Sequence, residues 1–174
     1  MAIQINGNGT ITGISAGGLP AGTVTSATLA SGVGGKVLQV LQNTSTNDIN
    51  NVTTTITELI SLSITPSATT SKILIQASSS IYCIPSTNSV VRTYLFRGTT
   101  SGTQLFTAFG GIDGDDNGDK SYPARSMIYL DSPNTTSATT YTFAMRTGSG
   151  GTSSLRAEGY DPHIIVLTEI AAWV

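Results

Sequence analysis

Apolar and polar residues alternate along most of the chain after residue 36, and the segment 52–65 is the clearest case. If this segment is extended, one side carries Thr and Ser, and the other carries Ile56, Ile60, Leu62 and Ile64. A period of two residues is typical of an antiparallel strand with one face toward a core and one toward water. We therefore expect a half-buried strand here.

The same alternation recurs in seven other segments, separated by Pro, Gly and Asn residues that are typical of turns. No segment of ten or more residues has the 3.6-residue period of an amphipathic helix. The sequence therefore predicts an all-β fold, an antiparallel β-sandwich that is jelly-roll-like and has about eight strands. We expect the strands at 36–42, 52–65, 72–83, 90–97, 103–109, 125–131, 139–146 and 163–172.

Residues 1–35 have a different pattern, in which single apolar residues stand between glycines with no sustained period. Such a segment cannot bury a face of its own. It must gain order by folding back on its own domain or on another copy, or, as we favour, by docking on a different protein. We predict an extended Gly/Thr-rich N-terminal mounting arm over 1–35 and a β-sandwich domain over 36–174. The residues expected to dock on a partner are Ile3, Ile5, Ile11, Ile14 and Leu19.

The composition argues against an enzyme. Only 10% of residues are charged, and the chain has one His, one Cys, 28 Thr and 21 Ser. Catalysis needs titratable groups that converge in a pocket, and few are present to form one. We therefore expect a non-enzymatic structural or binding role, without a cofactor.

Charge and hydropathy argue against two classes of partner, nucleic acids and membranes. The net charge is −2, and the eight Lys and Arg residues are scattered, so nucleic acid is not an expected partner. The longest aliphatic run, 164–167, is far shorter than the ~20 residues of a membrane helix, so membrane insertion is not expected. The opening MAIQINGNG lacks the basic and apolar parts of a secretory signal, which predicts synthesis in a cytoplasm.

One acidic loop has the ligand types of a calcium site. Asp113, Asp115, Asn117 and Asp119 have the one, three, five, seven spacing of a calcium-binding loop. The twelfth position is Ala124, where a complete loop has a bidentate Glu. We favour a solvated turn-rich loop and expect no bound metal, and Ca²⁺ binding stays open as the alternative.

Other titratable residues are interpreted as structural. His163 is close to Asp161 in sequence, but no nucleophile motif accompanies the pair, so we expect no catalytic triad. Cys83 occupies a strand position without activating neighbours. Glu58 and Glu169 fall within predicted strands on apolar faces, so each is a candidate buried partner of a Lys or Arg. For Glu58 we expect Arg92 or Arg146 as the partner.

Several stretches resemble a module that recurs in structural proteins of tailed bacteriophages, of the tail-fibre and capsid-decoration type. They are SLSITPSATTSKILIQ (61–76), RTYLFRGTT (92–100), YLDSPNTTSATTYTFAMRTGSG (129–150) and VLTEIAA (166–172). The opening NGNGTITGISAGGLPAGTVTSA (6–27) is similar to the mounting leader of such proteins. The resemblance implies a homotrimeric protein of the virion surface, with the arm at the particle and the β-domain outward. It transfers no catalytic residue.

Two positions on a particle fit this resemblance. The chain has no coiled coil or repeated shaft, so capsid decoration, which cements the shell by binding the major capsid protein, is preferred. The alternative is a short tail fibre or tail-tip adhesin bound to tail proteins, with Tyr82, Tyr94 or Tyr160 exposed for stacking on a host receptor. In either case Trp173, in the apolar C-terminus, is a candidate residue at the trimer axis.

Overall fold

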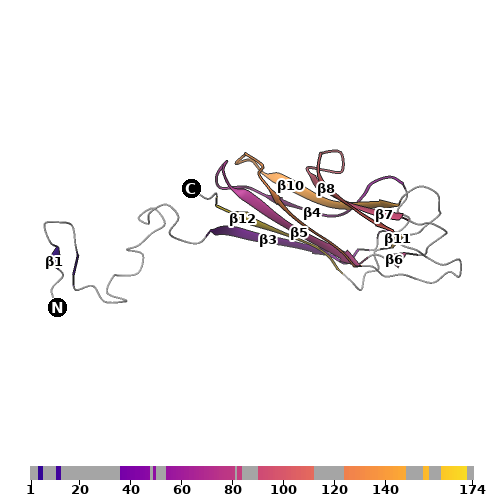
Figure 1. Cartoon of the computed structure of the whole chain (residues 1–174), viewed down its shortest axis with the longest axis horizontal. Helices are drawn as coiled ribbons and strands as arrows, with labels where there is room; N and C mark the ends of the chain where they lie inside the picture. Colours follow the sequence, from indigo (N-terminus) through magenta and orange to yellow (C-terminus); the bar gives the residue numbers. More distant parts are fainter. Residues whose placement is uncertain are drawn as a thin grey trace. The chain divides into compact units, whose positions relative to one another are not determined.

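The computed structural model consists of β-strands joined by turns and loops (Figure 1). It describes residues 4–5, 11–12, 36–47, 49, 54–80, 82–83, 90–111, 124–147, 155–156 and 162–171. The eight long strands overlap the eight segments predicted from alternation, and no described residue is helical. They are β3 (Val37–Ser45), β4 (Thr57–Ile64), β5 (Lys72–Ser80), β7 (Val90–Arg97), β8 (Thr103–Gly111), β9 (Ala124–Asp131), β10 (Thr139–Thr147) and β12 (His163–Ile170).

These strands form two four-stranded antiparallel sheets, with the orders β4-β10-β7-β8 and β3-β12-β5-β9. The pairing is nested. The first long strand pairs with the last, the second with the second-last, the third with the third-last, and the two middle strands pair with each other. Successive pairs alternate between the two sheets, which is the arrangement of a jelly roll. The predicted jelly-roll-like β-sandwich is therefore confirmed.

The two sheets lie face to face (Figure 1). Each presents a row of apolar side chains to the other. Each large apolar side chain that is fully enclosed in this way contributes about 1.5–3 kcal/mol relative to an exposed one. Tyr141 and Phe143 of β10 are the largest of the fully enclosed side chains. The rest of the buried core is Leu59, Ile60, Ile64, Ile73, Ile75, Ala77, Val91, Leu95, Met127, Met145, Ile165 and Leu167.

A β-bulge at Leu59 changes the predicted pattern of β4. Ile60 lies opposite Phe143, but the next residue of β10 lies opposite Glu58, so Leu59 is an extra residue. Leu59 and Ile60 are consequently both buried in the core, although they are adjacent in sequence. Ile56 packs on the other side of the sheet, so its predicted place beside Ile60 is wrong. Sequence alternation cannot show a bulge, because the extra residue is defined by the partner strand.

The chain divides into two compact units, Met1–Lys36 with Trp173–Val174, and Val37–Ala172. In the first unit, β1 (Gln4–Ile5) and β2 (Ile11–Thr12) form a short antiparallel pair in which Ile5 lies opposite Ile11. Two residues are too few to show alternation, so the sequence did not predict these strands. In the second unit, β6 (Tyr82–Cys83) pairs with β11 (Leu155–Arg156). The assignment of residues 1–35 as a mounting arm stays a prediction.

Candidate functional site

The single histidine of the chain is a structural residue. His163 Nδ1 lies 2.7 Å from the Ser79 hydroxyl, and His163 Nε2 lies 3.3 Å from the backbone oxygen of Asn47. Both His163 and Ser79 are buried at the ends of adjacent strands, so a substrate cannot reach the hydroxyl. A nucleophile needs access to its substrate. The pair therefore joins β5 to β12 rather than forming a hydrolytic site.

The prediction that Glu58 pairs with Arg92 or Arg146 is wrong. The bulge at Leu59 leaves the Glu58 side chain exposed, and its carboxylate accepts a 2.6 Å hydrogen bond from the Ser61 hydroxyl. The Arg146 guanidinium lies over the ring of Tyr94 instead, 5.7 Å from the ring centroid. Cation–π contacts of this kind favour arginine over an aromatic face.

A half-buried ion pair joins the two sheets at another place. Arg97, at the end of β7, donates to both carboxylate oxygens of Asp131 at the end of β9, over 2.6 and 2.8 Å. The Tyr141 hydroxyl donates to the same carboxylate over 2.7 Å. Burial, followed by the bond to Asp131, raises the pKa of the Tyr141 phenol, and the same carboxylate raises the pKa of Arg97. The network satisfies a buried charge and links the sheets through side chains.

The three residues of this network lie in the stretches that carry the resemblance to phage structural proteins. Sequence reasoning did not assign them a role, although a signal was present. Arg97 shares a strand face with the core residue Leu95, and Asp131 shares one with Met127. Opposite charges on two core-facing strand ends indicate an ion pair across the sandwich.

Glu169 is buried, as expected, but the predicted Lys or Arg partner is wrong. Its carboxylate accepts hydrogen bonds from the Gln39 side chain at 2.6 Å and from the backbone N–H and hydroxyl of Ser67, both at 2.7 Å. Burial alone would raise the pKa of Glu169, but the neighbouring donors Ser71, Gln39 and Ser67 lower it to about 2. Neutral donors therefore stabilise this carboxylate, and Glu169 ties β12 to the turn between β4 and β5.

An aromatic cluster on the outer face of the β4-β10-β7-β8 sheet is enclosed within the chain. Tyr94 and Phe96 stack at 5.9 Å between ring centroids, and they are only 5% and 4% exposed. Ile56 packs against them beside Ala144. Tyr94 is consequently not available as an exposed stacking surface for a receptor, so that expectation is wrong. Tyr160 and the side chain of Tyr82 lie outside the part of the chain that the structure describes.

The outer face of the β3-β12-β5-β9 sheet carries exposed aliphatic side chains, with Ser, Thr and Gln side chains between them. Val40, on the edge strand β3, is 59% exposed, and Ile128, on the edge strand β9, is 66% exposed. Between them, β12 turns half-exposed aliphatic side chains outward. We call this surface the apolar face, and it consists of Val37, Val40, Leu74, Ile128, Leu130, Ile164, Val166 and Ile170.

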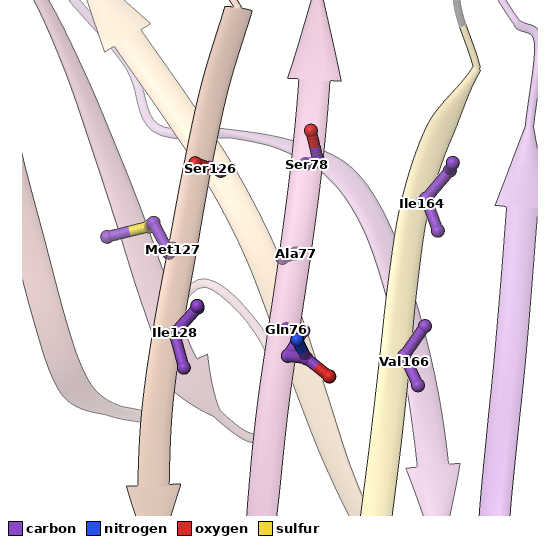
Figure 2. A pocket seen from close by; sticks show the side chains of 8 residues that line it. All are labelled: Gln76, Ala77, Ser78, Ser126, Met127, Ile128, Ile164 and Val166. Carbon is purple, nitrogen blue, oxygen red and sulfur yellow. The ribbon is translucent and has the colours of Figure 1, made fainter.

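A shallow hollow of about 240 Å³ lies in the apolar face. Figure 2 shows Ile128 on β9 and Ile164 and Val166 on β12, with Gln76 on β5 between the two strands. No charged residue lines the hollow, and its polar groups are those of Gln76, Ser78 and Ser126. Small-molecule pockets usually enclose about 300–1,000 Å³, so this hollow fits a partner side chain better than a ligand.

Of the remaining predicted site residues, some lie in the described part of the chain and others lie outside it. Ile5 and Ile11 lie opposite each other in the β1-β2 pair, whereas Ile3, Ile14 and Leu19 fall outside the described residues. The acidic loop with Asp113, Asp115, Asn117 and Asp119 falls outside them too, as does Trp173. Within the described ranges, no three His, Cys, Asp or Glu side chains are placed to hold a metal. The described strands and turns contain no helix of the length and apolarity of a membrane span.

No protein-family model matches the sequence, and no curated protein matches it. Solved structures similar to this chain include the T13 particle of infectious bursal disease virus (IBDV), with 17% identity and a TM-score of 0.39 over 77% of this chain and 36% of that chain. The IBDV VP2 subviral particle gives 13% identity and a TM-score of 0.40, over 77% and 37%. The structure of the Gx strain of the virus has 15% sequence identity and a TM-score of 0.40, over 77% of this chain and 38% of that chain. The chain thus spans little more than a third of the chains it matches, and likenesses this weak assign no family.

Proposed function

We propose that this chain is a non-enzymatic structural protein of a tailed-bacteriophage virion, mounted as a trimer on the particle surface by its N-terminal arm. Its role is capsid decoration, in which each trimer binds the assembled shell and not the loose subunits. Binding to the assembled state alone stabilises that state by mass action.

The observation that carries this proposal is the contrast between a sandwich with a well-packed core and an apolar face that no described segment covers. The core, the Arg97–Asp131 pair and the Glu169 network stabilise the domain without any ligand. The open apolar face provides a surface for assembly rather than for chemistry. The stretches that resemble phage structural proteins contribute to both, since 61–76 and 166–172 lie in these sheets.

Chemistry among the described residues supports a non-enzymatic role. The buried titratable groups each have a structural partner, and the sole histidine is enclosed with Ser79. General acid–base catalysis needs a group within hydrogen-bond reach of a substrate. None of these buried groups meets that condition.

The test is attachment to purified particles that lack the protein. The full chain should co-sediment with such particles and raise the temperature at which they release their genome. A form without residues 2–30, which retains the whole sandwich, should not attach because it lacks the predicted docking residues. Attachment of the truncated form would contradict the role of the arm.

Antibody labelling of intact virions separates the two positions on the particle. Label distributed over the capsid is the expected result. Label confined to the tail tip, with binding of the isolated protein to host cells, would overturn capsid decoration in favour of an adhesin.

A further inference from the structure

The apolar face has the character of a sheet surface that is covered in the functional protein. β12 has the sequence HIIVLTEI, and three of its four outward residues, Ile164, Val166 and Ile170, are aliphatic. Its inward residues at the centre of the strand, Ile165 and Leu167, are aliphatic too. A strand that is apolar on both sides is typical of a sheet covered on both sides. The aromatic cluster on the outer face of the other sheet is enclosed, whereas no described segment covers the aliphatic residues of this face.

We infer that this face is the contact between copies of the chain, with the apolar faces of the copies turned toward a shared symmetry axis. The inference deepens the proposed trimer and rests on the proposed function for the number of copies. The occupant of the apolar face is therefore a second copy of the same chain.

The size of the face agrees with a contact between folded copies. Four strands spaced about 4.8 Å apart, each of eight residues rising about 3.3 Å, give a projected area of about 500 Å². Side chains that protrude from the sheet make the accessible area larger than the projected area. Stable interfaces bury at least about 600 Å² on each partner, so the face is large enough when most of it is covered.

The charge on the face also favours a second copy. Among the described outward positions of the four strands, Lys72 alone is charged, and it lies at the start of β5. A charged partner would find no complementary charge at the centre of the face. The same apolar surface on another copy matches it, and Lys72 can stay at a hydrated rim.

The width of the face argues against an extended segment as the occupant. Exposed aliphatic residues lie on both edge strands, Val40 on β3 and Ile128 on β9. These edge strands are about 14 Å apart, whereas one extended chain covers a strip about 5 Å wide. A single arm segment would leave most of the face exposed.

The experiment measures the mass of the full chain by sedimentation and compares Ile128→Lys with Gln104→Lys. Gln104 is an exposed strand residue on the other sheet, opposite Phe96, so it is a matched position for the same new charge. The wild type and Gln104→Lys should have about three times the chain mass of 17.9 kDa. Ile128→Lys should associate at least about 100-fold more weakly, because a charge would be buried at the contact.

A second substitution guards against misfolding. Val40→Thr keeps a β-branched residue on the opposite edge strand, so the strand should form, and we expect association weakened by about tenfold. Circular dichroism checks that each variant has the wild-type strand content. Folded Ile128→Lys and Val40→Thr at the wild-type mass would overturn the inference, and so would a monomeric wild type.

Two further measurements distinguish this inference from the proposed function. A monomeric wild type in which Ile128→Cys resists thiol labelling until residues 2–30 are removed would identify the chain's own arm as the occupant and reject the inference. The wild-type oligomer could also fail to attach to particles. That result would reject the virion role and leave the contact between copies in place.

Discussion

The two sheets of the sandwich differ in whether the large apolar side chains on their outer faces are enclosed or exposed. The β4-β10-β7-β8 sheet covers its outer aromatics with residues of the same chain, so Tyr94 and Phe96 are almost fully enclosed. The β3-β12-β5-β9 sheet leaves Val40 and Ile128 more than half exposed. Each outer face carries large apolar side chains among polar ones, and the described residues enclose them on one sheet alone. The difference separates residues that stabilise the fold from residues available for association.

The largest effect should come from the network that joins the two sheets. In Arg97→Leu, the Asp131 carboxylate remains buried and loses its cation, which should lower the free energy of unfolding by about 3–5 kcal/mol. Tyr141→Phe removes one of the hydrogen bonds to Asp131 and should cost only about 1 kcal/mol. Urea unfolding measures both. Equal losses in the two variants would contradict the dominant role of the ion pair.

Shortening an enclosed side chain on the outer face of the β4-β10-β7-β8 sheet should lower the free energy of unfolding directly. Phe96→Ala removes a ring that is 4% exposed and should lower the free energy of unfolding by about 3 kcal/mol. Gln104→Ala changes the exposed neighbour opposite Phe96 and should alter it by less than about 0.5 kcal/mol.

Urea unfolding at several protein concentrations should distinguish a substitution on the apolar face from one on the outer face of the β4-β10-β7-β8 sheet. Ile128→Ala on the apolar face should lower stability only through weaker association, so its effect should disappear when the protein is diluted. The loss in Phe96→Ala should persist on dilution. The comparison between the faces is wrong if both losses depend on concentration in the same way.

The inner side of β12 should control acid stability without affecting association. The pKa of Glu169 is about 2 in the folded protein, below its ordinary value of 4.5, so its carboxylate stabilises the fold above about pH 4.5. That contribution, about 3 kcal/mol, should disappear as the pH falls from about 4.5 to 2. Glu169→Gln should lose stability at pH 7 and lack this part of the acid dependence, while its mass in solution stays that of the wild type.

The exposed Glu58 provides the control for Glu169. Glu58→Gln should change the free energy of unfolding by less than about 0.5 kcal/mol, because its side chain is in water. Urea unfolding at several pH values measures both variants. If Glu169→Gln retains the full acid dependence of the wild type, titration of the Glu169 carboxylate does not control it.

The sequence by itself determined the strands. Alternation with a period of two and the turn residues between segments predicted all eight long strands, because both signals are local to each strand. Isolated apolar residues in 1–35 also distinguished that segment from the domain. The sequence contained a signal for the apolar face in HIIVLTEI, which is apolar on both sides, although alternation cannot say which side a neighbour covers.

Only the tertiary structure decided which residues meet. The nested strand order brings Arg97 to Asp131 and Gln39 to Glu169 across long stretches of chain, and a bulge defined by β10 moves Glu58 away from its expected partner. Burial also depends on which residues pack against a face of a sheet. For this reason Tyr94 is enclosed, whereas Ile128 is exposed. Local patterns specify that a strand has two faces, whereas packing between distant segments decides which face remains open.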